Sequence, residues 1–312
     1  MRRLATIVAA IAGMGAVAMA AAPAASGAVR EYWVAAVPAP TWNMVPNQRD
    51  AIAGNLFSPA QTVFPTVVFR RYTRNWRHPV RNWPQQSGNQ DLIPGPLLRA
   101  RVGDRIRVHF RNRDTLYRRP HSMHFHGVHY KPSSDGAFVP GVSGRDGNVK
   151  PGQSYTYELT AGSDSKGVWP YHDHSPSMHD SILGGMYGML SILGRGERPP
   201  DREFGVVFAP MGPFQTIDGR AFVGNTPVFT AFPGELVQWD VMAMGSEHHT
   251  FHVHGHRWVD RDGRDIDTQN VGPAESFRIR WRERDPGTWL YHCHVETHME
   301  AGMVGTYHVR RR

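Results

Sequence analysis

Apolar positions along the chain fall in short runs that alternate with polar residues, which is the periodicity of half-buried β-strands. Examples are TVVFRRY, RIRVHF, SYTYEL, GVVFA, PVFTAF, ELVQWDV and SFRIRW, at residues 66–72, 105–110, 154–159, 205–209, 227–232, 235–241 and 276–281. Gly, Pro, Asn and Asp separate the runs, and β-branched and aromatic residues fill them. The pattern predicts an all-β protein built from antiparallel sandwiches.

The two halves of the chain repeat each other in order. GPLLRARVGDRIRVHF is matched by NTPVFTAFPGELVQWDV, HSMHFHG by HTFHVHG, WPYHDH by WLYHCH, and GGMYG by AGMVG. A polar segment with two prolines separates the halves. We therefore predict two β-sandwich domains of the same kind, over residues 29–194 and 204–312, with a linker at residues 195–203.

The first 28 residues have a different character. Arg2 and Arg3 precede an apolar run through Ala22, and small residues suit cleavage after Ala20 or Ala28. This is typical of an export signal, so we predict a signal at residues 1–28 and a secreted or periplasmic protein. The arginine pair raises twin-arginine export as an alternative, although the following residues fit that pattern poorly. No other segment is long and apolar enough to span a bilayer, so no membrane association is expected.

The chain is basic, with 35 Lys and Arg against 27 Asp and Glu and a net charge of +8. The arginines are scattered and no nucleic-acid motif accompanies them. We interpret them as a solvated surface and expect no nucleic-acid partner. The exception is RRYTRNWRHPVRNW, residues 70–83, which interleaves arginine with aromatic residues. We predict a strand end and a long surface loop there, with an access route as the alternative.

Histidines are concentrated in His-x-His pairs. Random placement of 18 histidines in 312 residues would give roughly one such pair. The chain has five, at 124/126, 172/174, 252/254, 254/256 and 292/294. Residues i and i+2 of a strand face the same side, so each pair offers two imidazoles to one metal site. Four of the pairs stand at repeated positions, which indicates a metal cluster.

The only cysteine, Cys293, lies in WLYHCHVETHMEAGM. One thiolate, two imidazoles and a long thioether form the ligand set of a blue copper site. Cys293, His298 and Met303 supply three of these ligands and His249 supplies the fourth, with Met299 as a rival thioether. Neighbours on a strand point to opposite sides, so the histidines on either side of Cys293 face a second centre.

Eight imidazoles are available for that second centre, from His124, His126, His172, His174, His252, His254, His292 and His294. Eight suit three copper ions with positions left open for O2, and several coppers together suit a reaction in which O2 takes up four electrons. Zinc is the rival metal. A structural zinc site needs only four ligands, however, and gains nothing from a thioether.

These motifs, HFHG at 124, HDH at 172, HTFHVH at 249 and HCHVETHMEAGM at 292, resemble those of two-domain multicopper oxidases of the small laccase type. The resemblance implies that each domain is a cupredoxin-like Greek-key β-sandwich. It also implies four coppers per subunit. Type 1 copper would be bound by His249, Cys293, His298 and Met303, type 2 by His124 and His252, and the type 3 pair by His126, His172, His174, His254, His292 and His294.

The first domain has Asp173 where the second has Cys293, so we predict no blue copper there, although His121 and Met186 stand at comparable places. This placement argues against a copper nitrite reductase, which has its blue copper in the first domain and three histidines at its catalytic copper. A non-enzymatic copper or electron carrier is another alternative, but a carrier would not need eight clustered histidines.

The resemblance implies one-electron oxidation of phenols and aromatic amines, coupled to four-electron reduction of O2 to water. Oxidases of Cu(I), Fe(II) or Mn(II) share the copper motifs and are the main alternative, although the 13 methionines are too scattered for the methionine-rich segment that these often carry. Similar oxidases place an acid after the HFHG motif. Asp135 is therefore a candidate proton relay, with a turn before Gly136 as the alternative, and Tyr130 is a candidate redox-active neighbour.

Each domain supplies four of the eight cluster histidines, so the cluster must form where a first and a second domain meet. The linker is short, and small laccases close this junction between neighbouring chains. We predict a homotrimer with three clusters at its subunit interfaces, because a head-to-tail contact forms a ring when its rotation closes.

Overall fold

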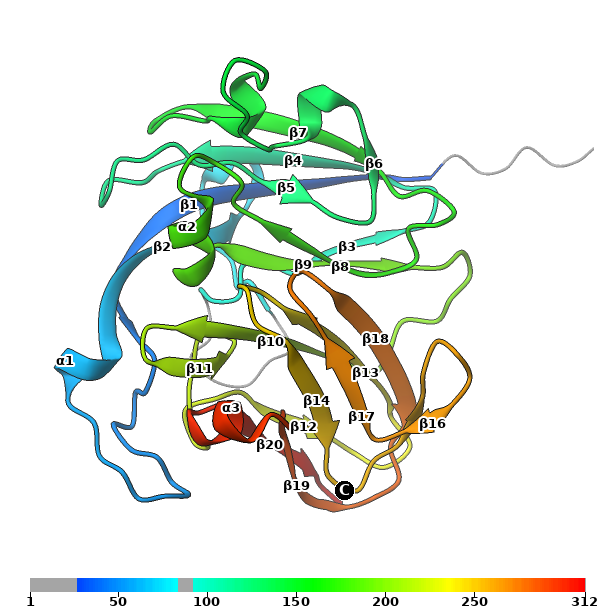
Figure 1. Ribbon diagram of the computed structural model, residues 1–312. Coiled ribbons are helices and arrows are strands. Elements are labelled where there is room, and N and C mark those ends of the chain that lie inside the picture. The colour runs from blue at the N-terminus through cyan, green and yellow to red at the C-terminus, as the bar shows by residue number, and fades with distance from the viewer. Residues whose placement is uncertain (1–26, 84–91, 312) are drawn as a thin grey trace, which may run out of the picture.

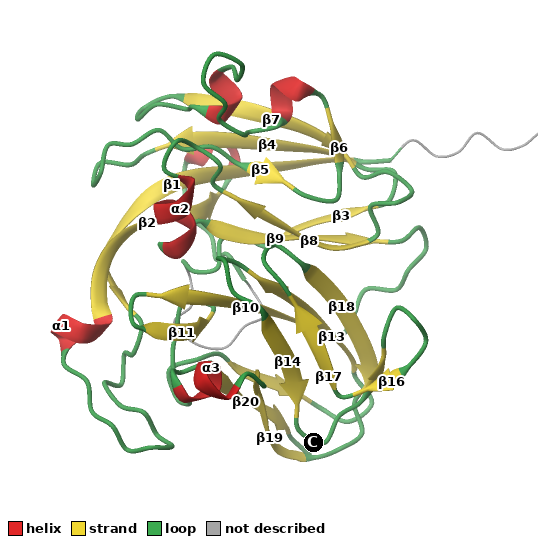
Figure 2. Ribbon diagram, in the orientation of Figure 1, coloured by secondary structure: helices red, strands yellow, loops and turns green. Residues whose placement is uncertain are grey.

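The computed structural model describes residues 27–83 and 92–311 and consists mainly of β-strands and loops (Figures 1 and 2). In the first half the strands are β1 (Val29–Asn43), β2 (Val63–Tyr72), β3 (Leu98–Arg101), β4 (Arg105–Asn112), β5 (His124–Phe125), β6 (His129–Tyr130), β7 (Ser154–Thr160), β8 (Gly167–His172) and β9 (Tyr187–Leu193). In the second half they are β10 (Arg202–Met211), β11 (Phe214–Ile217), β12 (Val228–Ala231), β13 (Leu236–Ala243), β14 (His249–Val253), β15 (Trp258–Val259), β16 (Asp265–Ile266), β17 (Thr268–Val271), β18 (Ser276–Arg282), β19 (Gly287–Cys293) and β20 (Val304–Val309). The helices are short, at α1 (Pro59–Thr62), α2 (Met178–Leu183) and α3 (Glu296–Glu300), with 3-10 turns at Arg74–Trp76, Pro132–Ser134 and Arg145–Gly147. The predicted all-β class is confirmed.

In each half two sheets enclose a core, and the second half carries in addition the two-stranded sheet β15-β16. In the first half the strand orders are β2-β1-β4-β7-β6 and β3-β9-β8-β5. Alternation along β4 buries Ile106, Val108 and Phe110 and leaves Arg105 and Arg107 exposed, as the polar and apolar pattern predicted. The core between the sheets is rich in aromatic residues, including Phe69, Phe110, Phe125, Tyr157 and Tyr171.

The second half repeats this topology, with strand orders β11-β10-β13-β18 and β12-β20-β19-β14-β17. The parallel pair of β1 with β4 has its counterpart in β10 with β13, and β3 with β9 has its counterpart in β12 with β20. Trp239 lies at the centre of this core, in contact with Phe204, Phe251, Tyr291 and Tyr307. The sequence repeat thus corresponds to two copies of one sandwich.

The two halves pack on each other through a third apolar cluster that draws on both, including Trp42, Tyr187, Val207 and Phe222. Polar contacts reinforce it at the point where β18 lies against β8 (Figure 1). The guanidinium of Arg278 donates to Asp240 in its own half, at 2.8 Å, and to the Ile192 carbonyl in the other half, at 2.9 Å. These contacts fix how the two sandwiches are oriented.

The arginine-rich segment begins as predicted, because β2 ends at Tyr72. Its aromatic rings pack under arginines on and just after β4 of the same sheet, with Arg113 over Tyr72 at 4.8 Å and Arg111 over Trp76 at 5.9 Å. The Trp76 indole N–H donates to the carbonyl oxygen of Val34. The segment therefore braces the outer surface of the first half.

The predicted export signal falls on residues 1–28, of which residues 1–26 lie outside the described part of the chain. Within residues 27–83 and 92–311, no helix has both the length and the apolar character needed to cross a membrane.

Candidate metal centres

Cys293 ends strand β19 and lies between two histidines from other elements. Its Sγ atom is 3.8 Å from Nδ1 of His249, on β14, and 3.7 Å from Nδ1 of His298, on α3. The two Nδ1 atoms are 3.1 Å apart. Cys293 and His249 are buried, whereas the His298 side chain is 14% exposed. The structure thus gathers three of the four residues predicted to bind the blue copper, with one of them at the surface.

The donor atoms of this group are better placed to bind a metal ion than to form hydrogen bonds with one another. Burial, together with His298 and His248, lowers the pKa of His249 to about 4, so its ring is neutral at pH 7. Burial also raises the pKa of the Cys293 thiol, so a thiolate there needs a cation beside it. One sulfur and two imidazole nitrogens form a soft donor set, which fits copper.

Met303, the predicted fourth ligand, returns to Cys293 directly after helix α3. Its N–H donates to the His298 carbonyl at 3.0 Å, and its own carbonyl accepts from the Cys293 N–H at 3.1 Å. The residue is fully buried in the same core cluster as Cys293. Met299 is partly exposed on the helix, which favours Met303 over its rival.

Glu247 and Gln215 complete the surface edge of this centre, and the sequence did not reveal them. The Glu247 carboxylate lies 3.3 Å from Nε2 of His298 and accepts from the Gln215 side-chain amide at 2.7 Å. The Glu247 side chain is 44% exposed. A small molecule that reaches His298 from solvent would therefore meet this carboxylate first. The only sequence signal was the position of Glu247, two residues before His249.

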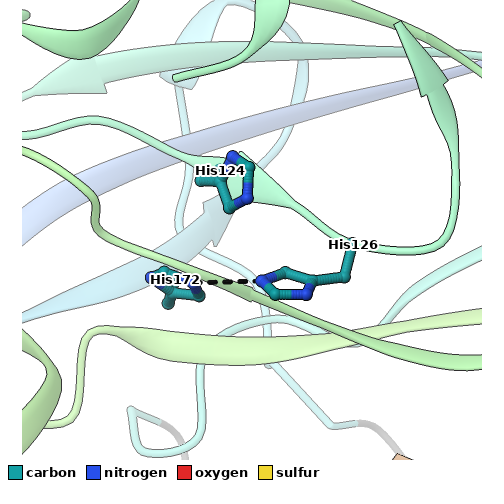
Figure 3. Close-up of side chains that lie close together, drawn as sticks. All are labelled: His124, His126 and His172. Atoms are coloured by element: carbon teal, nitrogen blue, oxygen red, sulfur yellow. Dashed lines mark hydrogen bonds between the residues drawn. The ribbon is translucent and has the colours of Figure 1, made fainter. Parts of the chain in front are cut away.

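The first histidine set lies on and just after β5 and at the end of β8, and comprises His124, His126 and His172, whose ligand atoms all lie within 4.8 Å of one another. Figure 3 shows Nε2 of His126 facing His172, and the two Nε2 atoms are 3.2 Å apart. The ring centroid of His174 is 5.3 Å from that of His124 and 5.6 Å from that of His172. The four histidines predicted for the first half thus converge.

The second set mirrors the first at the ends of β14 and β19. His252, His254 and His292 place their ligand atoms within 4.8 Å, and the Nε2 atoms of His254 and His292 are 3.1 Å apart. The ring of His294 is 5.5 Å from that of His252 and 5.3 Å from that of His292. The predicted alternation along this strand is also present, because Cys293 contacts a separate pair of histidines.

Backbone carbonyls fix the orientation of four of these rings. Nδ1–H of His124 donates to the Asp135 carbonyl at 2.7 Å, and Nδ1–H of His252 donates to the Asp267 carbonyl at 2.7 Å. His172 and His292 each donate to the carbonyl of the next residue, at 3.0 and 2.8 Å. A carbonyl only accepts, so Nδ1 carries the proton and Nε2 keeps its lone pair for a metal.

Burial and neighbouring imidazoles lower the pKa of His126, His172 and His292 to about 4. These rings are therefore neutral at pH 7, as metal ligands must be. Each half contributes four of the eight imidazoles predicted for the cluster. Within residues 27–83 and 92–311, no group of His, Cys, Asp and Glu side chains close enough to bind one metal ion includes residues from both halves of the chain.

Asp135 and Tyr130 both lie beside His124. The Asp135 carboxylate is 3.4 Å from Nδ1 of His124 and is 39% exposed. The Tyr130 ring meets the His124 ring edge-on, with centroids 6.2 Å apart. Burial raises the pKa of Tyr130, and Asp135 adds to the effect. Both candidate residues therefore lie at the edge of the histidine set, and the Asp135 carboxylate reaches solvent.

His256 is buried against Glu283 and His254. Its Nε2 lies 3.3 Å from the Glu283 carboxylate, and its Nδ1 donates to the His254 carbonyl at 2.7 Å. Tyr307 donates to the same carboxylate. Both ring nitrogens have polar partners, so this group braces His254.

Comparison with known proteins agrees with this geometry. Residues 71–197 and 201–312 each match the family description "Multicopper oxidase". The chain is 28% identical to human "Ferroxidase HEPHL1" over 351 residues, covering 91% of this chain and 29% of that protein. It is 32% identical over 248 residues to a "Probable nitrite reductase-hydroxylamine oxidoreductase fusion protein" of Kuenenia stuttgartiensis, covering 71% of this chain and 28% of that protein. The chain thus spans about three tenths of the length of these relatives.

A solved structure described as "Crystal structure of multicopper oxidase" superimposes with a TM-score of 0.67 at 24% identity, over 90% of this chain and 89% of the other. This likeness confirms the cupredoxin-like fold of the two sandwiches. The chain belongs to the multicopper oxidase family.

Proposed function

We propose that the protein is a laccase-type oxidase, which takes single electrons from phenols and aromatic amines near Cys293 and passes them to O2 at the histidine cluster. The observation that carries this proposal is that consecutive residues at the end of β19 belong to two different centres, the thiol centre and the histidine cluster. Cys293 contacts His298, while its neighbours His292 and His294 pack against His252. Electrons moving between the centres would need to cross only a few covalent bonds.

The proposed copper ligands are those predicted from the sequence. Type 1 copper would be held by His249, Cys293, His298 and Met303, type 2 by His124 and His252, and the type 3 pair by His126, His172, His174, His254, His292 and His294. When bound, copper would accept single electrons at the first centre and reduce O2 to water at the second. Backbone carbonyls orient four of the imidazoles by accepting from their Nδ1–H groups. The surrounding core excludes water from the Cys293 thiol. Asp135 would relay protons beside His124, and Tyr130 would be a redox-active neighbour of the same histidine.

We propose two domains, residues 29–194 and 204–312, with a linker at 195–203 and an export signal at 1–28. We also propose a homotrimer. Each half presents an incomplete set of four imidazoles, and no described group of ligand atoms joins the halves within one chain. A head-to-tail ring would complete each cluster with His124, His126, His172 and His174 of one subunit and His252, His254, His292 and His294 of the next.

Oxidation of a metal ion such as Fe(II), Cu(I) or Mn(II) is the second candidate. The observation that favours it is the Glu247 carboxylate beside His298, because carboxylate oxygens attract small cations. Human HEPHL1, to which the chain is similar, is named a ferroxidase. A nitrite reductase is disfavoured because the only cysteine lies in the second half and eight histidines gather in two sets.

Turnover with a panel of phenols, aromatic amines, Fe(II), Cu(I) and Mn(II), followed by O2 uptake, separates these candidates. We expect the highest kcat/KM with phenols. Glu247→Gln should lower kcat/KM for phenols roughly tenfold, because the amide still accepts a hydrogen bond but lacks the negative charge that strengthens it at the point of entry.

Glu300→Gln, which changes an exposed carboxylate on the same helix as His298, is the matched control and should leave turnover unchanged. Higher wild-type kcat/KM for Fe(II) than for any phenol, with a larger loss for Fe(II) than for phenols in Glu247→Gln, would instead identify a metal-ion oxidase.

A further inference from the structure

A buried cluster of three ionisable side chains occupies, in the first half, the place that the thiol centre occupies in the second. His121 stands where the second half has His249, and Asp173 stands where it has Cys293. Asp114, from the loop after β4, completes the cluster. The three residues are 2%, 0% and 1% exposed in the order His121, Asp173, Asp114. Buried charged groups of this kind must be paired to be tolerated.

Asp173 is tied to both neighbouring chain segments. Its Oδ1 accepts from the Ser122 N–H at 2.8 Å, and its own N–H donates to the Met186 carbonyl at 3.0 Å. The N–H of the next residue, His174, donates to the Ser122 hydroxyl at 3.1 Å. These bonds join the end of strand β8 to the segment that leads into β5.

Cys293 makes the same three kinds of contact in the second half. Its Sγ accepts from the Thr250 N–H at 3.4 Å, and its N–H donates to the Met303 carbonyl at 3.1 Å. The N–H of His294 donates to the Thr250 hydroxyl at 3.0 Å. Asp173 therefore has the backbone environment of the thiol ligand.

The two halves differ in the distance from this side chain, Cys293 or Asp173, to the neighbouring histidine ring. In the second half, 3.8 Å separates Sγ of Cys293 from Nδ1 of His249. In the first half the longer carboxylate reaches further, and Oδ2 of Asp173 lies 2.9 Å from Nδ1 of His121. A direct charge-assisted hydrogen bond stands where the other half has donor atoms suited to a metal.

Asp114 holds the far side of the His121 ring. Its Oδ2 lies 3.2 Å from Nε2 of His121, and its oxygens accept the N–H groups of Leu116, Tyr117 and Arg119. Burial opposes a charged imidazole, but hydrogen bonds with Asp114 and Asp173 outweigh it and raise the pKa of His121 to about 9. The ring is thus a cation held between two carboxylates.

We propose that His121, Asp114 and Asp173 form an ionic clamp that replaces a metal ion as the cross-link of the first half and positions its four cluster histidines. Asp173 lies between His172 and His174 in the chain, and His121 immediately precedes the segment with His124 and His126. The clamp joins these two segments without metal. The three residues are positioning residues, and the inference rests on the proposed copper cluster.

The clamp makes a prediction about copper that activity alone would not reveal. In Asp173→Asn the cation on His121 loses one carboxylate, so the strand ends should lose their fixed spacing. We expect the purified protein to keep its blue colour, which arises from Cys293 in the other half. It should lose most of the histidine-bound copper, seen as a fall in copper per chain and loss of the type 2 signal in electron paramagnetic resonance.

Asp180→Asn is the matched control, because Asp180 is a 67% exposed carboxylate of the same half, paired with Arg119. It should keep all copper. If Asp173→Asn does not fold, Asp114→Asn carries the same test without altering the residue between His172 and His174. Circular dichroism and the melting temperature of each variant establish that the folded fractions are equal.

The outcomes separate the clamp from the function on which it rests. A wild-type protein that binds no copper at the histidines would overturn the proposed cluster. A wild-type protein with full copper, beside a folded Asp173→Asn protein with the same copper content and spectra, would overturn the clamp alone.

Discussion

Cys293→Ser is expected to remove the blue colour and reduce oxidase turnover to the level of a blank. Cys293 is the only cysteine in the chain, so no other residue can supply the copper–thiolate bond that gives the colour. The fold should survive, because serine has nearly the same shape and its buried hydroxyl costs roughly 1–3 kcal/mol. Visible absorption, copper content and O2 uptake on one preparation are the measurements.

The copper bound by histidines serves as the internal control in this variant. Because His292 and His294 face the other centre, that copper should be retained while the colour is lost. A serine variant that stays blue would show that the thiol centre has been assigned to the wrong residue. Loss of all copper would show that Cys293 also supports the histidine cluster.

Mixed assembly of two inactive chains is expected to restore activity. His124→Ala disables the first half of the cluster and His294→Ala disables the second, so each variant alone should be inactive. In a head-to-tail trimer, an intact junction forms wherever the first half of a His294→Ala chain meets the second half of a His124→Ala chain. Every trimer that contains both kinds of chain has one such junction among its three, so about a third of wild-type activity should return in the mixed trimers.

Co-expression with two affinity tags, purification through both tags and light scattering together measure this effect. The matched control is a mixture of His124→Ala with His126→Ala chains, which share a defective first half and should stay inactive. Full activity in a monomer, or no recovery in doubly tagged trimers, would contradict clusters shared between subunits.

Periodicity and repetition predicted much of the fold and of the candidate site. Strand alternation and the repeated motifs depend on residues close in sequence, so the all-β class and the His-x-His pairs were visible directly. The opposite facing of Cys293 and its neighbouring histidines also followed from strand geometry. Such features need no knowledge of long-range packing.

Contacts between distant segments were not predictable in this way. Glu247 contacts Gln215, which is 32 positions away in the sequence, and His298, which lies on a different element. No motif and no hydrophobic periodicity in the sequence indicates these contacts. The sequence showed that Asp173 replaces the thiol ligand. Only the structure shows that Asp114, 59 positions earlier in the chain, stabilises the same histidine from the other side. The side-by-side packing of the two sandwiches likewise depends on tertiary contacts such as those of Arg278.

The stoichiometry of O2 consumption tests the central claim most directly, because it reports whether the thiol centre and the histidine cluster act together. A known amount of a phenol that gives up one electron is oxidised to completion in an oxygen-electrode cell, and peroxide is assayed afterwards. We expect four equivalents of phenol per O2 and no peroxide, since four electrons convert O2 to water. Two equivalents per O2 with accumulating peroxide, or oxidation without O2 uptake, would contradict a multicopper oxidase mechanism for this chain.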